Sequence, residues 1–123
     1  MYKSWSVEDI RKEMKKMDRI LGKRGSELPI KINPRMTRSL GMYKFKIEDK
    51  KIVPICFEFS TKTVSGEYDE NTVIGIIRHE YAHYAANDIH KEACGHDRRF
   101  KNICELVGAP GNAVMRKKGD KVC

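Results

Sequence analysis

The sequence predicts an α+β fold with an N-terminal helix, a small antiparallel sheet and two further helices. Apolar residues recur at helical spacing near the N-terminus and again after residue 69, whereas residues 28–59 alternate apolar and polar side chains as strands do. The length of 123 residues suits one domain. A domain of this size can bury a sizeable core without disulfide bonds. We expect a single domain over residues 1–123, with its core at about 5–110 and a basic tail at 111–123.

The first helix is expected to begin after Ser6. The Ser6 side chain can accept a hydrogen bond from the helix N-terminus, and Asp9 stands at the third helical position, as in a capping box. Gly22 can end this helix. The apolar stripe expected to face the core consists of Ile10, Met14, Met17 and Leu21.

Residues 28–59 predict three short strands. One candidate spans residues 28–33, and the segments 43–47 and 55–59 are expected to form a hairpin through a turn at 48–50. Pro54 cannot donate to a ladder, so it indicates a sheet edge or the start of a strand. An edge strand can bind a peptide by main-chain pairing, and the segment 54–59 is our candidate for that role. The polar segment 60–69 is expected to be a linker.

A second helix is expected from about Asp69 to Asn87, and it carries the motif HExxH at residues 79–83. Histidines four residues apart, here His79 and His83, stand on one helical face and can bind the same Zn²⁺ ion. Glu80 would lie beside that ion without binding it, where it can accept a proton from water. The alternative is a pair of histidines hydrogen-bonded in the core. The helix is apolar over most of its circumference, which predicts a central, buried position.

A catalytic zinc site usually has three protein ligands, so a third one is required. The chain has four histidines, which leaves His90 and His96, with Glu92 and Cys94 as weaker candidates. If the helix continued past His83, His90 would lie roughly 10.5 Å farther along its axis, too far to bind the same ion. Residues 84–86 (YAA) favour such a continuation.

His96 is the better-placed candidate for the third ligand. It follows Gly95 and a loop that can reverse the chain, and it precedes a third predicted helix that Gly108 and Pro110 end. The apolar residues of that helix are Phe100, Ile103, Cys104 and Val107. We therefore predict a zinc site with the ligands His79, His83 and His96.

The net charge of +8 is unevenly distributed along the chain. Residues 1–52 hold 15 Lys and Arg against 7 Asp and Glu, residues 53–97 hold 3 against 8, and residues 98–123 hold 7 against 2. Basic surface attracts phosphate groups, so the basic flanks indicate nucleic acid as a partner. The alternative is a charge-rich surface that has no special partner.

The sequence gives no sign of export or of a membrane. No apolar run approaches the roughly 20 residues that span a bilayer, and the first residues lack the apolar stretch of a signal peptide. The four cysteines form no CxxC pair and are expected to be reduced thiols, with Cys56 and Cys104 in the core. We expect a cytoplasmic monomer.

Three blocks of the sequence resemble the SprT-like zinc metallopeptidases, a family that includes Spartan and the bacterial SprT proteins. These blocks are residues 32–41 (INPRMTRSLG), 78–84 (RHEYAHY) and 95–101 (GHDRRFK), and the last two are the specific part. The resemblance implies a compact zincin-like fold, with zinc bound by His79, His83 and His96 and with Glu80 as the catalytic base. Asp97 stands where the family often has a second glycine.

The resemblance also implies a function, the hydrolysis of peptide bonds in a protein or peptide substrate. Because Spartan degrades proteins crosslinked to DNA, the resemblance extends to DNA-bound proteins as substrates. The alternative is a catalytically silent, zinc-containing DNA-binding module, but a structural site has no use for Glu80. Candidates for the donor that stabilises the oxyanion are Tyr43, Arg98 and Arg99. Tyr81 and Tyr84 project away from the histidine face and are expected in the core.

Overall fold

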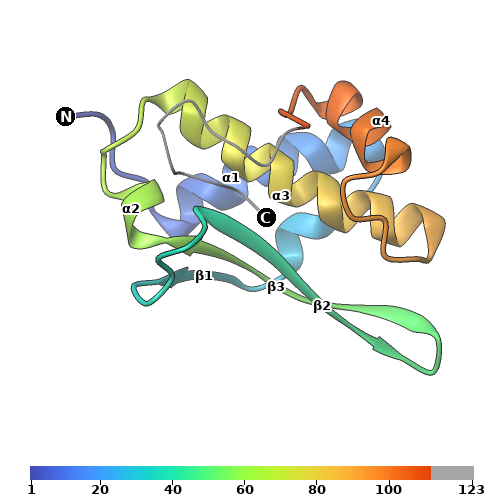
Figure 1. The fold of residues 1–123 in the computed structure, drawn as a ribbon. Helices are drawn as coiled ribbons and strands as arrows, with labels where there is room; N and C mark the ends of the chain where they lie inside the picture. The colour runs from blue at the N-terminus through green and yellow to red at the C-terminus, as the bar shows by residue number, and fades with distance from the viewer. Residues whose placement is uncertain (112–123) are drawn as a thin grey trace.

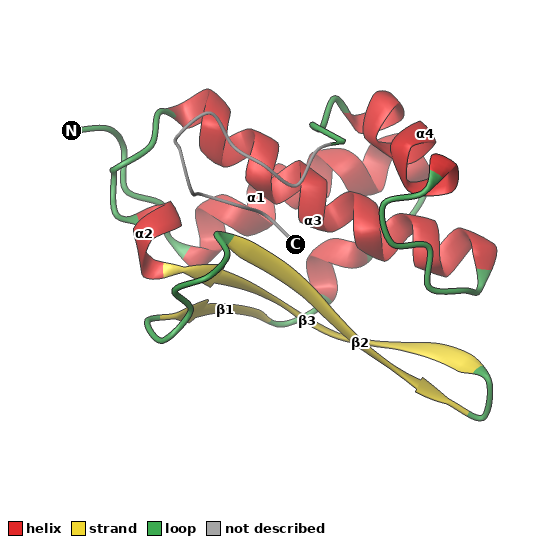
Figure 2. Ribbon diagram, viewed as in Figure 1, coloured by secondary structure: helices red, strands yellow, loops and turns green. Residues whose placement is uncertain are grey.

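The computed structural model describes residues 1–111 and has the predicted α+β class. Figures 1 and 2 show the helices gathered on one face of a twisted sheet, with the β2–β3 hairpin extending beyond them. The helices are α1 (Val7–Leu21), α2 (Thr61–Val64), α3 (Glu70–His90) and α4 (Arg98–Val107), with a 3-10 turn at Gly25–Glu27. The strands are β1 (Ile30–Asn33), β2 (Gly41–Glu48) and β3 (Lys51–Ser60).

Helix α1 begins and ends as its sequence predicts. The Asp9 N–H donates to Ser6 Oγ at 3.1 Å, and the Ser6 N–H donates to Asp9 Oδ2 at 3.0 Å, which completes the capping box. Gly22 ends the helix in the left-handed conformation. In the predicted stripe, Ile10, Met14 and Met17 are buried and Leu21 packs partly buried against the core.

The sheet is mixed rather than antiparallel throughout. Strand β3 lies in the middle, with β2 antiparallel on one side, as the predicted hairpin requires, and β1 parallel on the other. The direction of β1 corrects the expected antiparallel sheet. Asp49 and Lys50 form the hairpin turn with φ of 51° and 63°, the positive pair that suits the twist of a tight hairpin.

Pro54 lies inside β3, which corrects the expectation that it marks an edge strand or the start of its strand. It is tolerated for two reasons. The pairing with β2 shifts register at Lys44 and Phe45, so Pro54 sits at an irregularity opposite Phe45, and β1 pairs only with residues 57–60. Because β3 is the central strand, residues 57–59 cannot also pair with a peptide. The edge strands are β1 and β2, and β2 packs against α3.

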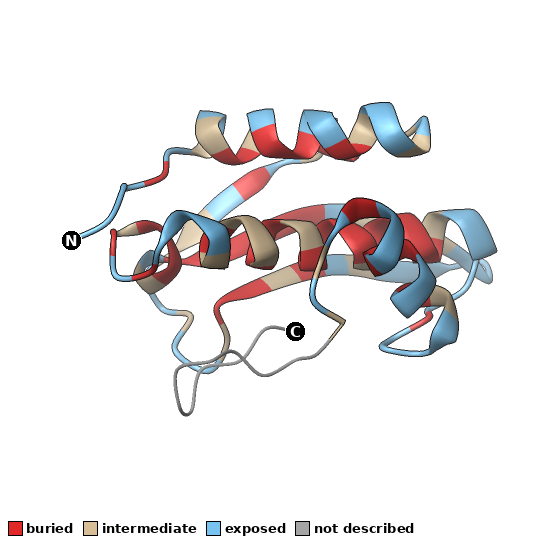
Figure 3. Cartoon of the chain, turned by 90° about the horizontal axis from the view of Figure 1, so that it is seen from above, coloured by how far each residue is buried: buried red, intermediate tan, exposed pale blue. Residues whose placement is uncertain are grey.

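Helix α3 occupies the centre of the fold, as its apolar circumference predicts. It contacts α1, α4, β2 and β3, and Figure 3 shows buried residues along much of its length. Arg78 links it to both neighbouring helices, donating to the buried Glu13 on α1 at 2.9 Å and to the carbonyl oxygen of Val107 on α4 at 3.0 Å. The predicted linker 60–69 differs from expectation because it begins with the short α2, which Ser60 caps.

The described part of the chain contains no helix with both the length and the apolar character needed to cross a membrane. Except for Gly111, the predicted basic tail at 111–123 lies outside the described residues.

Candidate metal centre

Three histidines from two parts of the chain converge on one point. His79 and His83 lie one turn apart on α3, and His96 lies in the loop directly before α4. One ring nitrogen from each falls within 4.8 Å of the other two. The Nε2 atoms of His79 and His96 are 3.3 Å apart, and two nitrogens bound at about 2.0–2.1 Å to a tetrahedral zinc lie about 3.3–3.4 Å apart. This pair therefore has the spacing of two ligands of a tetrahedral ion such as Zn²⁺, and the His83 nitrogen lies close enough to be a third ligand.

A hydrogen bond at Nδ1 fixes the orientation of the His79 ring. Its Nδ1 atom lies 2.8 Å from the carbonyl oxygen of Pro110, which can only accept a hydrogen bond, so Nδ1 carries the proton and donates. Nε2 is then left without a proton and faces His96, which is the tautomer that a metal ligand needs. His79 is buried, His83 is half-buried and His96 is exposed, so the site opens to solvent on the His96 side.

Phe100 on α4 supports all three rings. Its ring is fully buried and stacks on His83, with 4.2 Å between centroids and 18° between planes. It meets His79 and His96 edge-on at 5.0 and 5.1 Å between centroids. One apolar side chain thus restricts the rotation of every candidate ligand.

The other candidates for the third ligand lie away from this group. Helix α3 continues through His90, as residues 84–86 predicted, and this exposed residue ends the helix. The Glu92 carboxylate pairs with Arg99 at 2.6 Å. Burial raises the pKa of the Cys94 thiol, which disfavours the thiolate that binds metals. Among the described residues, only His79, His83 and His96 form a group that could hold a metal ion.

The loop that delivers His96 is held at both ends. Asn87 accepts a hydrogen bond from the Cys94 N–H at 2.9 Å, which ties the loop to α3. Asp97 is the N-cap of α4 and accepts from the N–H groups of Arg99 and Phe100. The Arg99 side chain, and after it these backbone bonds, lower the pKa of the Asp97 carboxyl group. Asp97, where the family often has a glycine, therefore caps the helix that follows His96.

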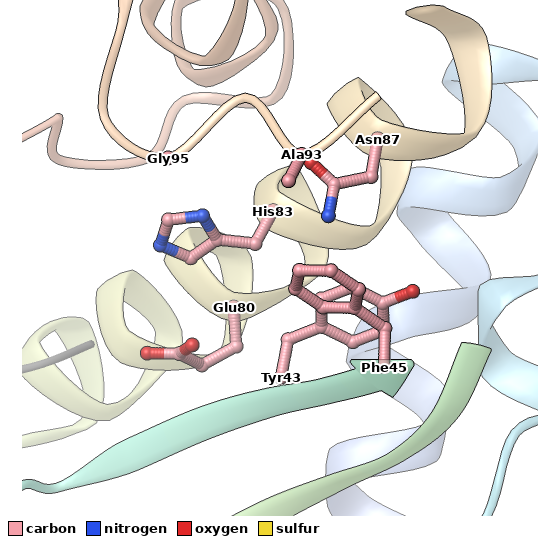
Figure 4. A pocket seen from close by; sticks show the side chains of 7 residues that line it. All are labelled: Tyr43, Phe45, Glu80, His83, Asn87, Ala93 and Gly95. Carbon is pink, nitrogen blue, oxygen red and sulfur yellow. The ribbon is translucent and has the colours of Figure 1, made fainter. Parts of the chain in front are cut away.

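Glu80 lies fully buried on α3, between the candidate ligands and strand β2. Gly41 lets β2 come this close, because a Cβ atom there would lie 3.1 Å from Glu80 Cγ and 3.2 Å from Ile76 Cγ2. Figure 4 shows the Glu80 carboxylate and the His83 ring at one end of a shared pocket. A carboxylate and the imidazole of a candidate metal ligand thus border the same cavity.

The tyrosines are placed differently from one another. Tyr81 and Tyr84 are buried in the core, as predicted, and the Tyr81 hydroxyl donates to Asp18 at 2.5 Å. Tyr43 lines the pocket, but Figure 4 shows its hydroxyl pointing away from the Glu80 carboxylate, so it does not serve as a donor there. Arg99 pairs with Asp97 and Glu92, which commits its guanidinium outside the site.

Sequence reasoning missed three residues that shape this site. Pro110 was predicted only to end a helix, Asn87 only as the end of the HExxH helix, and Phe100 only as an apolar helix position. A signal existed for Phe100, because it follows His96 by four residues at the start of a helix. The contacts of Pro110 and Asn87 join segments whose spacing carries no periodic signal.

Comparison with known protein families identifies the family of the chain. A model of the SprT-like family matches residues 10–118, a range that includes all three histidines and Glu80. No curated protein and no solved structure matches the chain. The family match covers most of the sequence and confirms the resemblance that its motifs carry, and the chain belongs to the SprT-like family.

Proposed function

We propose that this protein is a zinc-dependent metallopeptidase that hydrolyses peptide bonds in protein substrates. The observation that carries the proposal is the group of three histidine nitrogens within 4.8 Å of one another, two of them at the spacing of tetrahedral zinc ligands, next to the buried carboxylate of Glu80. The match to the SprT-like family supports it. When bound, zinc would supply the Lewis acid that activates water and polarises the peptide carbonyl.

Side chains of the protein would bind the metal ion and transfer the proton. His79, His83 and His96 would hold the ion, with Pro110 and Phe100 fixing the ring orientations. Glu80 would accept the proton of the attacking water on a carboxylate oxygen and deliver it to the nitrogen of the leaving amine. The exposed edge of His96 leaves a route for substrate to reach the site.

Strand β2 offers the substrate a place to bind. It lies at the edge of the sheet, and Gly41 brings its main chain against Glu80. An extended peptide can pair with the free main-chain groups of such an edge. This assignment replaces the segment 54–59, which lies in the central strand.

We also propose that the substrates are DNA-bound proteins and that the protein acts on them in the cytoplasm. The net charge of +8 supports contact with phosphate groups. Many basic residues of the N-terminal half already pair with acids, however, including Arg11, Lys16, Lys23, Lys44 and Lys46. The buried free thiols of Cys56, Cys94 and Cys104 suit a reducing compartment.

Substitution of Glu80 by Gln tests the function. The variant keeps nearly the same size and all three histidines, so it should fold and bind zinc as the parent does. Without a general base it should hydrolyse casein about 10²–10⁴-fold more slowly. Both quantities are measured on the same preparations, hydrolysis by release of labelled peptides and zinc by mass spectrometry.

Glu105→Gln is the matched control, since it makes the same change at an exposed position on α4. It should hydrolyse casein at the parental rate. A Glu80→Gln variant with the parental rate would contradict the role of Glu80. A parent protein that binds zinc but cleaves nothing would favour the silent DNA-binding module.

A further inference from the structure

A cavity of about 210 Å³ lies beside His83, one of the three candidate ligands. Figure 4 shows it between α3, strand β2 and the loop that leads to His96. Its lining residues are Tyr43, Phe45, Glu80, His83, Asn87, Ala93 and Gly95. Pockets that enclose whole drug-sized ligands measure about 300–1,000 Å³, so this cavity suits a single large side chain.

Apart from the Asn87 amide, the walls of the cavity are apolar on the side away from Glu80. The rings of Tyr43 and Phe45 stack on each other, with 5.5 Å between centroids and 19° between planes, and form its floor in Figure 4. Ala93 and Gly95, in the loop that leads to His96, form the opposite wall. Aromatic surfaces of this kind bind aliphatic and aromatic groups by burying apolar area.

Asn87 supplies one polar group at a fixed orientation. It is 2% exposed, and its Oδ1 atom is held by the Cys94 N–H at 2.9 Å. That bond turns the amide nitrogen toward the rings of Tyr43 and Phe45, as Figure 4 shows. The cavity thus has a neutral donor that can meet one oxygen of a bound group.

Charged side chains are disfavoured in the cavity. None of the lining residues is a lysine or an arginine, so an acidic side chain would be buried without a cation. The only carboxylate in the lining is Glu80, which the proposed function uses as the base. A long basic side chain in the cavity would pair with the Glu80 carboxylate and would interfere with its role as the base.

We infer that this cavity is a specificity subsite, which receives one large apolar or aromatic side chain of the substrate next to the bond that is cut. The inference rests on the proposed function, because the cavity borders Glu80 and His83. Phe45 and Ala93 set its width from opposite sides. The protein then prefers to cut bonds next to leucine, methionine or an aromatic residue.

Binding of small hydroxamates to the zinc-loaded protein tests the subsite without relying on turnover. Each compound carries a hydroxamate group, which binds the metal, next to one varied residue: glycine, leucine, phenylalanine or aspartate. In one series the hydroxamate precedes that residue, and in the other series it follows it. In one series the leucine and phenylalanine members should bind about tenfold or more tightly than the glycine member. The aspartate member should gain nothing.

Two variants locate the bound side chain. Ala93→Leu fills the cavity and should remove the preference for leucine and phenylalanine over glycine. Phe45→Ala removes one wall and should also weaken that preference. Ile47→Ala is the matched control, since Ile47 is 64% exposed on the same strand and does not line the cavity, and it should change nothing.

The outcomes distinguish a failure of the subsite from a failure of the proposed function. Equal binding of glycine, leucine and phenylalanine members in both series would overturn the subsite and leave the metallopeptidase standing. A preference that neither Ala93→Leu nor Phe45→Ala alters would overturn it too, because the side chain would lie elsewhere. No binding of any hydroxamate would overturn the proposed metal centre and the subsite together.

Discussion

Phe100 holds the three histidine rings of the candidate site with one side chain. It contacts each ring and is fully buried, so its contribution is both to the core and to the geometry of the ligands. A ligand set of this kind is only as well oriented as the groups behind it. Here those groups are an aromatic ring on α4 and the carbonyl oxygen of Pro110.

Replacement of Phe100 by Ala should therefore reduce stability and zinc affinity together. Removal of a fully buried phenylalanine side chain costs about 3–5 kcal/mol in the free energy of unfolding. Chemical denaturation measures that loss, and competition with a chelator measures zinc affinity, which should fall by about tenfold or more. Leu106→Ala on the same helix should change stability by no more than about 0.5 kcal/mol, since Leu106 is 61% exposed. Equal effects of the two variants would contradict this account of Phe100.

The residues that could be predicted are those whose function depends on spacing along the chain. His79 and His83 are four apart on a helix, and His96 was selected because His90 lies too far along the same helix. Phe45 and Asn87 could not be predicted, because they reach the site through the register of β2 and the path of a loop. Such contacts arise only when the whole chain has folded.

Glu58 joins the three strands of the sheet. It lies on β3 and accepts hydrogen bonds from Asn33 on β1 at 2.9 Å and from Lys44 on β2 at 2.7 Å. These bonds, first that from Lys44 and then that from Asn33, lower the pKa of the Glu58 carboxyl group below its usual 4.5. The sheet is thereby held by a side-chain network in addition to its ladders.

This network predicts how stability depends on pH. A carboxyl group whose pKa is lower in the folded state stabilises the fold above its unfolded pKa, about 4.5, and this contribution is lost as pH falls through the folded pKa. Glu58→Gln should therefore be less stable than the parent at pH 7, and the difference should shrink as pH falls toward 3. Denaturation curves at several pH values measure it, with the exposed Glu48→Gln as control. A difference that stays constant with pH would count against the network.

The elements were predicted better than their pairing. Alternation of apolar and polar residues identified the strands, but it does not specify whether neighbours run parallel, and β1 proved parallel to β3. Pro54 was interpreted from its missing N–H alone, whereas the shift of register opposite Phe45 makes room for it inside the strand. Helix α2 is a single turn and too short to show periodicity.

Taken as a whole, the molecule places its site at the seam between α3, the edge strand β2 and the loop before α4. All of the excess positive charge belongs to residues 1–52 and 98–123, because residues 53–97, which carry the HExxH motif, hold more acids than bases. Several of these basic residues form ion pairs within the described chain. The positive charge that is not paired with an acidic side chain determines how strongly the protein attracts a polyanion.

Binding to DNA should accordingly be weak, independent of sequence and strongly dependent on salt. Contacts with phosphate release counterions, so affinity falls steeply as salt rises. Titration of labelled single- and double-stranded DNA at about 50 mM and about 200 mM salt measures this dependence. Lack of binding at the lower salt concentration would leave a peptidase that finds its substrates without DNA.

The zinc content of three purified proteins tests the central claim, that His79, His83 and His96 hold the metal. After dialysis, the parent and His90→Ala should each retain about one zinc per chain, whereas His96→Ala should retain much less while its circular dichroism shows an intact fold. The two variants make the same change, one at the end of α3 and one at the end of the loop that leads into α4. Full zinc content in His96→Ala together with loss of zinc in His90→Ala would contradict the account.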